Sequence, residues 1–382
     1  MRRSERGKGR RKLFHTYYDY SLLFLVLFLV GFGLIMIYST SSFNAERNFG
    51  DAAYYLKKQG IFGLLGIGVM LFVSMFDYRL FLKPLPIIRI RLVTLFYLIC
   101  MGLQVYVLIF GRVVKGSKRW IDLGPFGFQP SELSKVALIV FVSYIIQLAP
   151  RKLDKFSGFM RVAVFAAPLL LLVVIPNFST GLIMGVIFVG ICFVASRKKL
   201  YFIVAGLLGV AAGAFFIFGV DYRGERIEIW RDIETHPKGY QILQGLYAIA
   251  SGGVFGKGLG QSMQKLGFIP ESHNDMIFSV ICEELGLFGA VSVILLYILV
   301  IWRLFIIAIN APDLFGGLIA TGILTHISIQ VLINIAVVTN TIPSTGIPLP
   351  FISYGGSSLV FLLFEMGIAL SISNQIKYEK AW

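Results

Sequence analysis

The strongest candidate for acid–base chemistry is Asp275, in the stretch 269–278 (IPESHNDMIF), where a long polar segment meets an apolar run. Partial desolvation at such a boundary raises the pKa of a carboxyl group, which suits the group to act as a general base. The alternative is that Asp275 caps the helix that follows, a position in which Asp is common. His273 is a second candidate base, although a single loop histidine is usually a surface residue.

A second set of charges lies in 118–135 (KRWIDLGPFGFQPSELSK). Glu132 and Lys135 are three residues apart and can share one helical face. They form either a structural ion pair or part of a polar cavity, because charges facing lipid are costly. Basic side chains beside an aromatic ring can bind the phosphates of an anionic lipid, and the start of the stretch, together with Lys115 just before it, offers Lys115, Lys118 and Arg119 next to Trp120.

Other motifs exclude some chemistries. The glycine-rich stretch 252–260 (GGVFGKGLG) lacks the spacing of a dinucleotide-binding loop, so it predicts a bend, with Lys257 near an anionic head group. Glu283 and Glu284 follow Asp275 by about 12–14 Å along a helix, too far for a close dyad, and we expect them to pair with basic residues or line a cavity. The three cysteines and the spacing of histidines and carboxylates indicate neither a disulfide framework nor a metal site.

The stretch 339–358 (TNTIPSTGIPLPFISYGGSS) combines three prolines with three glycines. It is either a simple connector or a packed, re-entrant element. Irregular backbone near a membrane persists only where protein or a watery cavity covers it, and this favours the packed element.

The elements that position these residues follow from composition. Hydrophobic residues make up 57% of the 382, charged residues only 14%, and the mean hydropathy is +0.80, which excludes a soluble protein of this length. We predict an all-α polytopic membrane protein with about ten transmembrane helices. Its apolar segments lie at 20–39, 61–76, 92–110, 131–149, 161–175, 181–196, 200–219, 276–308, 314–339 and 357–376.

The predicted domain organisation is a basic N-terminal tail (1–19), one transmembrane domain (20–376) and a short C-terminal tail (377–382). Within the domain, 220–275 forms a large extracellular loop between spans seven and eight, and 240–250 has the pattern of an amphipathic helix in the membrane interface. The run 276–308 is too long for a single crossing, so its first part, with Glu283 and Glu284, should lie near the outer surface or a cavity.

The charge distribution predicts orientation. With both termini cytoplasmic, the cytoplasmic segments carry 21 of the 35 Lys and Arg and six of the 20 Asp and Glu, which accounts for the net charge of +15. The basic charge is therefore an orientation signal and does not indicate a nucleic-acid partner.

Three stretches resemble signatures of the SEDS family (shape, elongation, division and sporulation; FtsW, RodA and SpoVE). They are GSKRWIDLGPFGFQPSELSK (116–135), GYQILQGLYAIASGGVFGKGLGQSMQKLGFIPESHNDMIFSVICEELGLFG (239–289) and STGIPLPFISYGGSS (344–358), in the family's order. The resemblance covers essentially the whole chain. It implies a ten-span peptidoglycan glycosyltransferase that polymerises lipid II, the undecaprenyl-diphosphate-linked disaccharide-pentapeptide, with its active site on the outer face of the bacterial cytoplasmic membrane.

By this resemblance Asp275 matches the family's essential aspartate and would act as general base in an inverting reaction. Glu132 and Lys135 match a charged pair in the fourth span. The residues we assign to the lipid II cavity are Lys115, Lys118, Arg119, Trp120, Gln129, Ser131, Glu132, Lys135, Lys257, Lys265, His273, Ser353, Tyr354 and Ser357. The implied partner is a class B penicillin-binding protein, together with other membrane proteins of the division or elongation machinery.

No organic cofactor is implied. A divalent cation, Mg²⁺ or Mn²⁺, could assist the diphosphate, but the sequence shows no ligand set for it. Several stretches, including YRGERIEIW (222–230), look more like the division-type members than the elongation type, which stays the alternative. Two different functions also remain open: a lipid II flippase or another transporter, suggested by charges such as Glu365 within the spans, and a scaffolding membrane protein.

Overall fold

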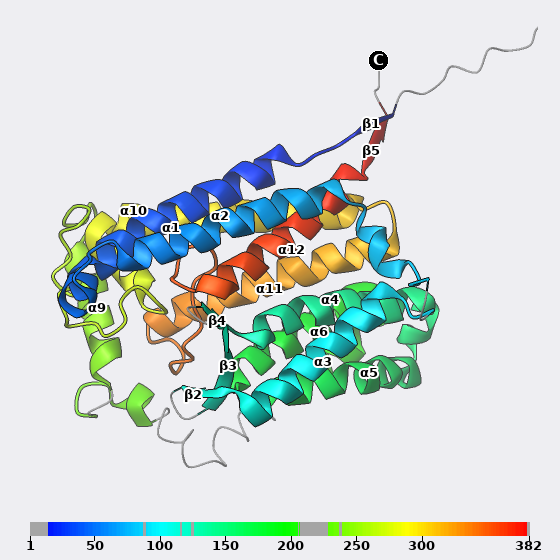
Figure 1. The fold of residues 1–382 in the computed structure, drawn as a ribbon, viewed down its shortest axis with the longest axis horizontal. Coiled ribbons are helices and arrows are strands. Elements are labelled where there is room, and N and C mark those ends of the chain that lie inside the picture. The colour runs from blue at the N-terminus through cyan, green and yellow to red at the C-terminus, as the bar shows by residue number, and fades with distance from the viewer. Residues whose placement is uncertain are drawn as a thin grey trace, which may run out of the picture.

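The computed structural model describes residues 14–86, 89–114, 117–123, 126–204, 206, 228–236 and 239–379. In these ranges nine helices are long and apolar enough to cross a membrane, and they form one bundle (Figure 1). They are α1 (Tyr20–Phe49), α2 (Tyr54–Met75), α3 (Leu92–Phe110), α4 (Pro130–Leu148), α5 (Phe156–Val174), α6 (Phe178–Ala195), α10 (Ile277–Asn310), α11 (Leu314–Val338) and α12 (Gly356–Asn374).

These nine helices confirm nine of the ten predicted segments. The remaining segment, 200–219, lies mostly outside the described residues, as do Lys115 and most of the tail 1–19. Helix α1 runs ten residues past the predicted apolar segment to Phe49, and this last part carries the polar side chains Ser41, Ser42, Asn44, Glu46 and Arg47.

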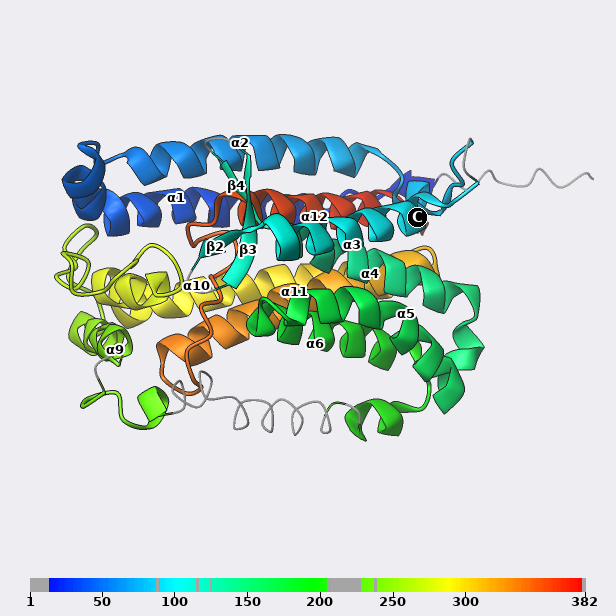
Figure 2. The same ribbon diagram turned by 60° about the horizontal axis from the view of Figure 1, so that its bottom comes forward.

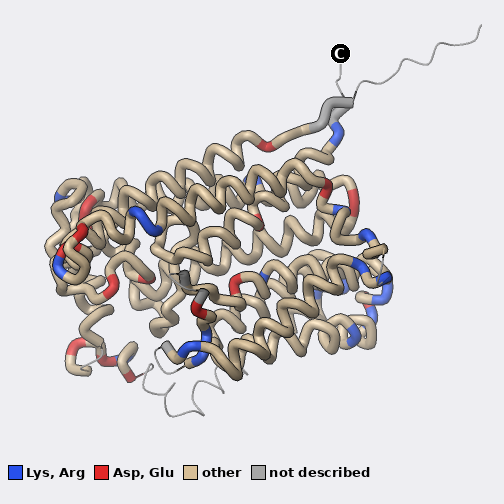
Figure 3. Tube along the Cα trace, viewed as in Figure 1, with Lys and Arg blue, Asp and Glu red and all other residues tan. Residues whose placement is uncertain are grey.

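Both described chain ends lie at one end of the bundle, which we call the terminal end (Figure 1). There β1 (Phe14–Thr16) pairs antiparallel with β5 (Lys377–Glu379). The short helices η1 (Tyr78–Leu82) and η2 (Pro150–Asp154) connect spans at this end. Lys and Arg gather here, whereas charges of both signs mix at the opposite end (Figure 3).

The opposite end, called the loop end, carries the elements that hold most of the candidate site residues. A three-stranded antiparallel sheet of β2 (Arg112–Val114), β3 (Ser117–Leu123) and β4 (Phe126–Phe128) joins α3 to α4. Figure 2 shows this sheet on one side of the bundle and α9 (Tyr240–Gly252) at the loop end beside α10. The segment 339–355 connects α11 to α12 at the same end.

Helix α4 lies at the centre of the bundle, in contact with α3, α5, α6, α11 and α12. Its side chains are buried on nearly every face. Helices α2 and α12 pack closely because glycines remove side chains between them. A Cβ on Gly66 of α2 would lie 2.5 Å from Leu363, and one on Gly367 of α12 would lie 2.8 Å from the Met70 carbonyl oxygen.

Helix α9 forms where the sequence predicts it, but its buried face is a glycine face. A Cβ on Gly245 would lie 2.3 Å from Met276, and one on Gly252 would lie 2.0 Å from the Cys282 carbonyl oxygen. Helix α9 therefore packs against the first turns of α10. The small residues permit this close packing. Tyr240 and Tyr247 are exposed on α9, and the position of the helix in the membrane interface stays a prediction.

Helix α10 breaks at Gly286, whose φ of 66° and ψ of −163° are not helical. The loop after α9 fills the break with main-chain hydrogen bonds. The amides of Lys257 and Gly258 donate to the carbonyls of Glu283 and Glu284 at 3.0 and 2.9 Å, and the amides of Leu287 and Phe288 donate to the carbonyls of Gly253 and Val254 at 2.9 and 3.1 Å. These hydrogen bonds satisfy the main-chain groups of α10 that lose their helical partners where the helix breaks. They confirm that the run is no single straight crossing.

Candidate functional site

Asp275 lies in the turn directly before α10, partly exposed at the loop end. Met276, one residue after Asp275, is the N-cap residue of α10 and makes no side-chain capping bond. The Asp275 carbonyl accepts a hydrogen bond of 2.8 Å from the Asn334 side chain. A Cβ built on Gly346 would lie 3.9 Å from Oδ2 of Asp275. The carboxylate therefore faces the segment between α11 and α12.

That segment, 339–355, is a packed element, as the sequence predicts. Its main chain is held by four side chains from the surrounding helices. Asn334 donates to the Ile347 carbonyl at 2.8 Å, Gln330 to the Pro348 carbonyl at 3.0 Å, Tyr297 to the Pro350 carbonyl, and Gln59 to the Ser353 carbonyl at 3.3 Å. Ile347, Leu349, Phe351 and Ile352 are buried. The main chain of a simple connector would be hydrated instead of hydrogen-bonded to side chains of the surrounding helices.

His273 is buried beside Asp275 and packs against two tyrosines. Its ring centroid is 4.3 Å from that of Tyr55 and 5.5 Å from that of Tyr354, and its carbonyl accepts from the Tyr354 amide at 2.9 Å. Burial lowers the pKa of His273 to about 4. The imidazole is therefore neutral at neutral pH. Its Nδ1 atom is buried without a hydrogen-bond partner and can bind a polar group of a substrate.

Glu132 and Lys135 form the predicted ion pair, with Nζ 3.0 Å from Oε2, and both are at least nine-tenths buried in α4. The Ser358 hydroxyl at the start of α12 donates to the same Oε2 at 2.7 Å. The pair thus joins α4 to the end of segment 339–355. Ser358 also lines a small cavity with Gln330 and Ser353. The ion pair therefore has a structural role, and its place in a substrate cavity stays a prediction.

The candidates on segment 339–358 have different environments. The Ser353 hydroxyl accepts a bond of 2.8 Å from the Leu349 amide and so stabilises the turn. The Ser357 hydroxyl is buried and lacks a partner, which leaves it available to a bound group.

The candidates on and next to the sheet β2–β4 are engaged with protein. Lys118 donates to the Ile109 carbonyl, and Arg119 donates to the Pro176 carbonyl, each at 2.7 Å. Trp120 packs over Gly127, where a Cβ would lie 3.1 Å from the indole. Gln129 donates to Ser131 at 3.1 Å. Contact between these side chains and a phosphate stays a prediction.

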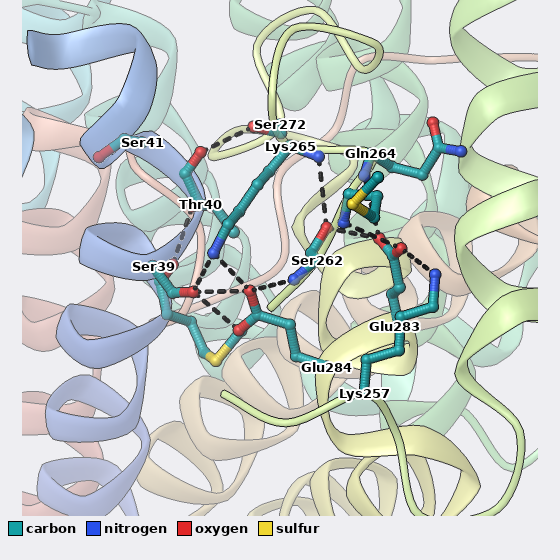
Figure 4. Close-up of polar contacts among 12 residues, drawn as sticks. Ser39, Thr40, Ser41, Lys257, Ser262, Gln264, Lys265, Ser272, Glu283 and Glu284 are labelled. Carbon is teal, nitrogen blue, oxygen red and sulfur yellow. Dashed lines mark hydrogen bonds and ion pairs between the residues drawn. The ribbon is translucent and has the colours of Figure 1, made fainter. Parts of the chain in front are cut away.

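Two acidic residues of α10 organise a buried network at the loop end (Figure 4). Glu283 binds Lys257 at 2.7 Å, and Glu284 binds Lys265 at 2.8 Å and the Ser39 hydroxyl at 2.7 Å. This confirms that both glutamates pair with basic residues. Because Lys265 is 5% exposed, its main contact is with protein. Lys265 also closes one side of a groove of about 460 Å³ lined by Leu34, Ile35, Tyr38, Ser39, Ser42, Leu56, Leu259 and Gly260.

Sequence reasoning missed four residues that shape the site: Gln59, Tyr297, Gln330 and Asn334. Each bonds the main chain of segment 339–355, and each is buried. The available signal was an isolated polar side chain in an otherwise apolar span, since such residues are costly and usually face a partner.

The part of the chain that is similar to known proteins is nearly the same as the predicted transmembrane domain. Residues 20–378 match the FtsW/RodA/SpoVE family, described as cell cycle proteins. The chain is 39% identical over 365 residues to the probable peptidoglycan glycosyltransferase FtsW of Geobacter sulfurreducens (strain DL-1 / KN400), covering 94% of this chain and 96% of that protein. It is 38% identical over 369 residues to stage V sporulation protein E of Bacillus subtilis (strain 168), covering 94% and 98%.

A solved structure also shares the fold. It is a chain from the study "Structural coordination of polymerization and crosslinking by a peptidoglycan synthase complex", with a TM-score of 0.78 and 27% identity. The match covers 93% of this chain and 97% of that chain.

Proposed function

The chain belongs to the FtsW/RodA/SpoVE family, and on that premise we propose that it is a division-type peptidoglycan glycosyltransferase that polymerises lipid II. Identities of 39% to a protein named FtsW and 38% to a sporulation protein support the division type over the elongation type. The observation that carries the proposal is the position of Asp275, between the buried segment 339–355 and the first turn of α10.

In the proposed reaction Asp275 acts as the general base. Its carboxylate takes the proton of the GlcNAc 4-hydroxyl of the acceptor, and the oxygen attacks the anomeric carbon of the donor MurNAc. The bond between that carbon and the phosphate oxygen breaks, and undecaprenyl diphosphate leaves with the electron pair. Attack opposite the leaving group inverts the anomeric configuration. A positioned base contributes about 10²–10⁴-fold to the rate of such a step.

The leaving diphosphate needs positive charge near it. Lys118, Arg119 and Lys257 retain partly exposed side chains at the loop end and are the basic candidates for this contact. Lys135 and Lys265 are buried in ion pairs, so we assign them to organising the cavity.

A divalent cation, Mg²⁺ or Mn²⁺, would have to be held largely by the diphosphate and water. Among the described residues, no three His, Cys, Asp or Glu side chains gather closely enough to bind one metal ion. The protein part of the site does not fit a resident metal cofactor, and no step is assigned to one.

The orientation proposed is termini inside and loop end outside. Its support is the concentration of Lys and Arg at the terminal end (Figure 3), since cytoplasmic loops collect these residues. Asp275 and the sheet β2–β4 would then face the compartment in which the cell wall is built. The similarity to a chain of a peptidoglycan synthase complex supports a membrane partner, which we propose to be a class B penicillin-binding protein.

The test is polymerisation of labelled lipid II by the purified protein with its partner. Asp275→Asn keeps the shape and removes the base, and should reduce glycan formation by about 10²–10⁴-fold. Asn274→Ala is the matched control, because the Asn274 side chain bonds only the exposed Glu271 side chain among the hydrogen bonds of the described residues. Glycan formed by Asp275→Asn at the control's rate would refute the mechanism. A translocation assay with fluorescent lipid II tests the transporter alternative, which predicts movement that persists in Asp275→Asn.

A further inference from the structure

Two ionisable side chains meet in the interior of the bundle, away from the site described above. His326 lies near the middle of α11 and Glu365 near the middle of α12, each 1% exposed. His326 Nδ1 is 2.7 Å from Glu365 Oε2. Ionisable groups at membrane depth are costly and are usually retained for a specific contact.

The hydrogen bonds around the pair fix where its protons lie. The Pro348 carbonyl can only accept, so the Gln330 amide nitrogen, 3.0 Å away, donates to it. The Gln330 oxygen then faces His326 Nε2 at 2.8 Å, and Nε2 must carry a proton to bond it. One further proton lies between Nδ1 and the Glu365 carboxyl group. His326 and Glu365 together carry no net charge, and the hydrogen bonds determine that His326 has a proton on Nε2.

This chain of contacts runs along one face of α11 to the catalytic end. His326, Gln330 and Asn334 are spaced four residues apart, so they stack on that face. Gln330 holds the Pro348 carbonyl, and Asn334 holds both the Ile347 and the Asp275 carbonyls. A change at Glu365 therefore reaches segment 339–355 through His326 and Gln330, and Asn334 joins the same segment to the main chain of Asp275.

Charged residues from α4 also approach the pair, but they are already matched. Glu132 is bonded to Lys135 and to Ser358, which lines the same small cavity as Gln330. The orientation of the Gln330 amide therefore depends on its two hydrogen-bond partners, the Pro348 carbonyl and His326 Nε2, and not on a charge from α4.

We infer that His326 and Glu365 are positioning residues for glycosyl transfer, which lock Gln330 and with it segment 339–355 against Asp275. The inference rests on the proposed function for its kinetic readout. The inference predicts that the side chain at position 365 must donate a hydrogen bond to Nδ1 of His326, and that this side chain need not be charged.

The variants follow from that requirement. Glu365→Leu leaves Nδ1 without a donor, frees the imidazole to change tautomer and releases Gln330. We expect at least a tenfold loss of kcat with less than a twofold change in KM for labelled lipid II. Glu365→Gln supplies an N–H of the same reach and should keep kcat within about twofold of the original protein. Ser328→Ala is the matched control, because the Ser328 hydroxyl bonds the carbonyl of Leu324 in its own helix.

A second pair of variants tests whether the contacts act in series. Gln330→Leu should lower kcat about as much as Glu365→Leu, and the double variant should be no slower than either single variant. Additive losses would overturn the inference. So would a Glu365→Leu protein with unchanged kcat, or a Glu365→Gln protein as slow as Glu365→Leu.

A spectroscopic readout is independent of activity. The chain has four histidines, so ¹⁵N-histidine labelling with comparison to His326→Gln assigns the His326 signals. We expect a protonated Nε2 in the original protein and in Glu365→Gln. An unprotonated Nε2 would overturn the inference. An active Asp275→Asn protein would instead refute the proposed mechanism and leave the tautomer result standing.

Discussion

Replacing Lys265 with methionine isolates the energetic role of the buried network at the loop end. Glu284 is 0% exposed and has the Lys265 ammonium 2.8 Å from Oε1. Without that ammonium, Glu284 keeps only neutral donors, the Ser39 hydroxyl at 2.7 Å and the Ser262 amide at 3.4 Å. Leaving one member of a buried pair uncompensated costs about 3–5 kcal/mol.

The expected result is a fall in melting temperature on the order of 5–15 °C for Lys265→Met, measured by tryptophan fluorescence in lipid nanodiscs. The double variant Lys265→Met/Glu284→Met removes both charges and replaces them with apolar groups of similar length. It should recover most of the loss, because a buried pair exchanged for apolar side chains is often close to neutral.

A matched control lies on the same loop. The Lys257 side chain is 34% exposed, and its partner Glu283 keeps bonds from Ser262 and Met263, so Lys257→Met should lower the melting temperature less than Lys265→Met does. The reasoning would be refuted if Lys265→Met melted within about 2 °C of the original protein. It would also be refuted if the double variant melted as low as the single one.

Three further predictions concern backbone strain and pH. Gly346 has a φ of +69°, so Gly346→Ala should cost about 1–2 kcal/mol and lower kcat with labelled lipid II, since the methyl group would lie 3.9 Å from Asp275 Oδ2. Gly286→Ala should lower the melting temperature further, because its Cβ would lie 2.3 Å from a loop backbone nitrogen. Gly31→Ala, in open space on α1, is the control for both and should change neither quantity. The pKa of His273 is about 4 when folded and about 6.5 in an unfolded chain, so the unfolded chain binds more protons between these values. Stability should therefore fall by up to about 3 kcal/mol as pH drops from 6.5 to 4, and denaturant titrations of His273→Phe should lose that part of the slope.

The spans and the position of Asp275 could be predicted from the sequence because they depend on local patterns. Apolar runs mark the helices, and the junction of a polar loop with such a run marks the residues directly before a helix. The length of the run beginning at 276 even predicted a departure from one crossing, which Gly286 provides.

The contacts that define the site depend on residues far apart in the chain. Ser39 lies 245 residues before Glu284, and Gln59 lies 294 residues before Ser353. No spacing rule relates such pairs. The main-chain carbonyls bonded by Gln59, Gln330 and Asn334 belong to an irregular segment whose path has no sequence period. The polar residues could have been identified as unusual, but their partners could not.

The break in α10 has a consequence for how the loop after α9 moves. Four main-chain hydrogen bonds join the loop to the helix, donated by the amides of Lys257, Gly258, Leu287 and Phe288. The loop therefore cannot separate from the helix without leaving main-chain groups of both unbonded. In hydrogen–deuterium exchange these four amides should open as one cooperative unit. The stretch 253–258 is therefore held to the helical bundle, and a protease that cuts there should reach its site only when the first turns of α10 have unwound.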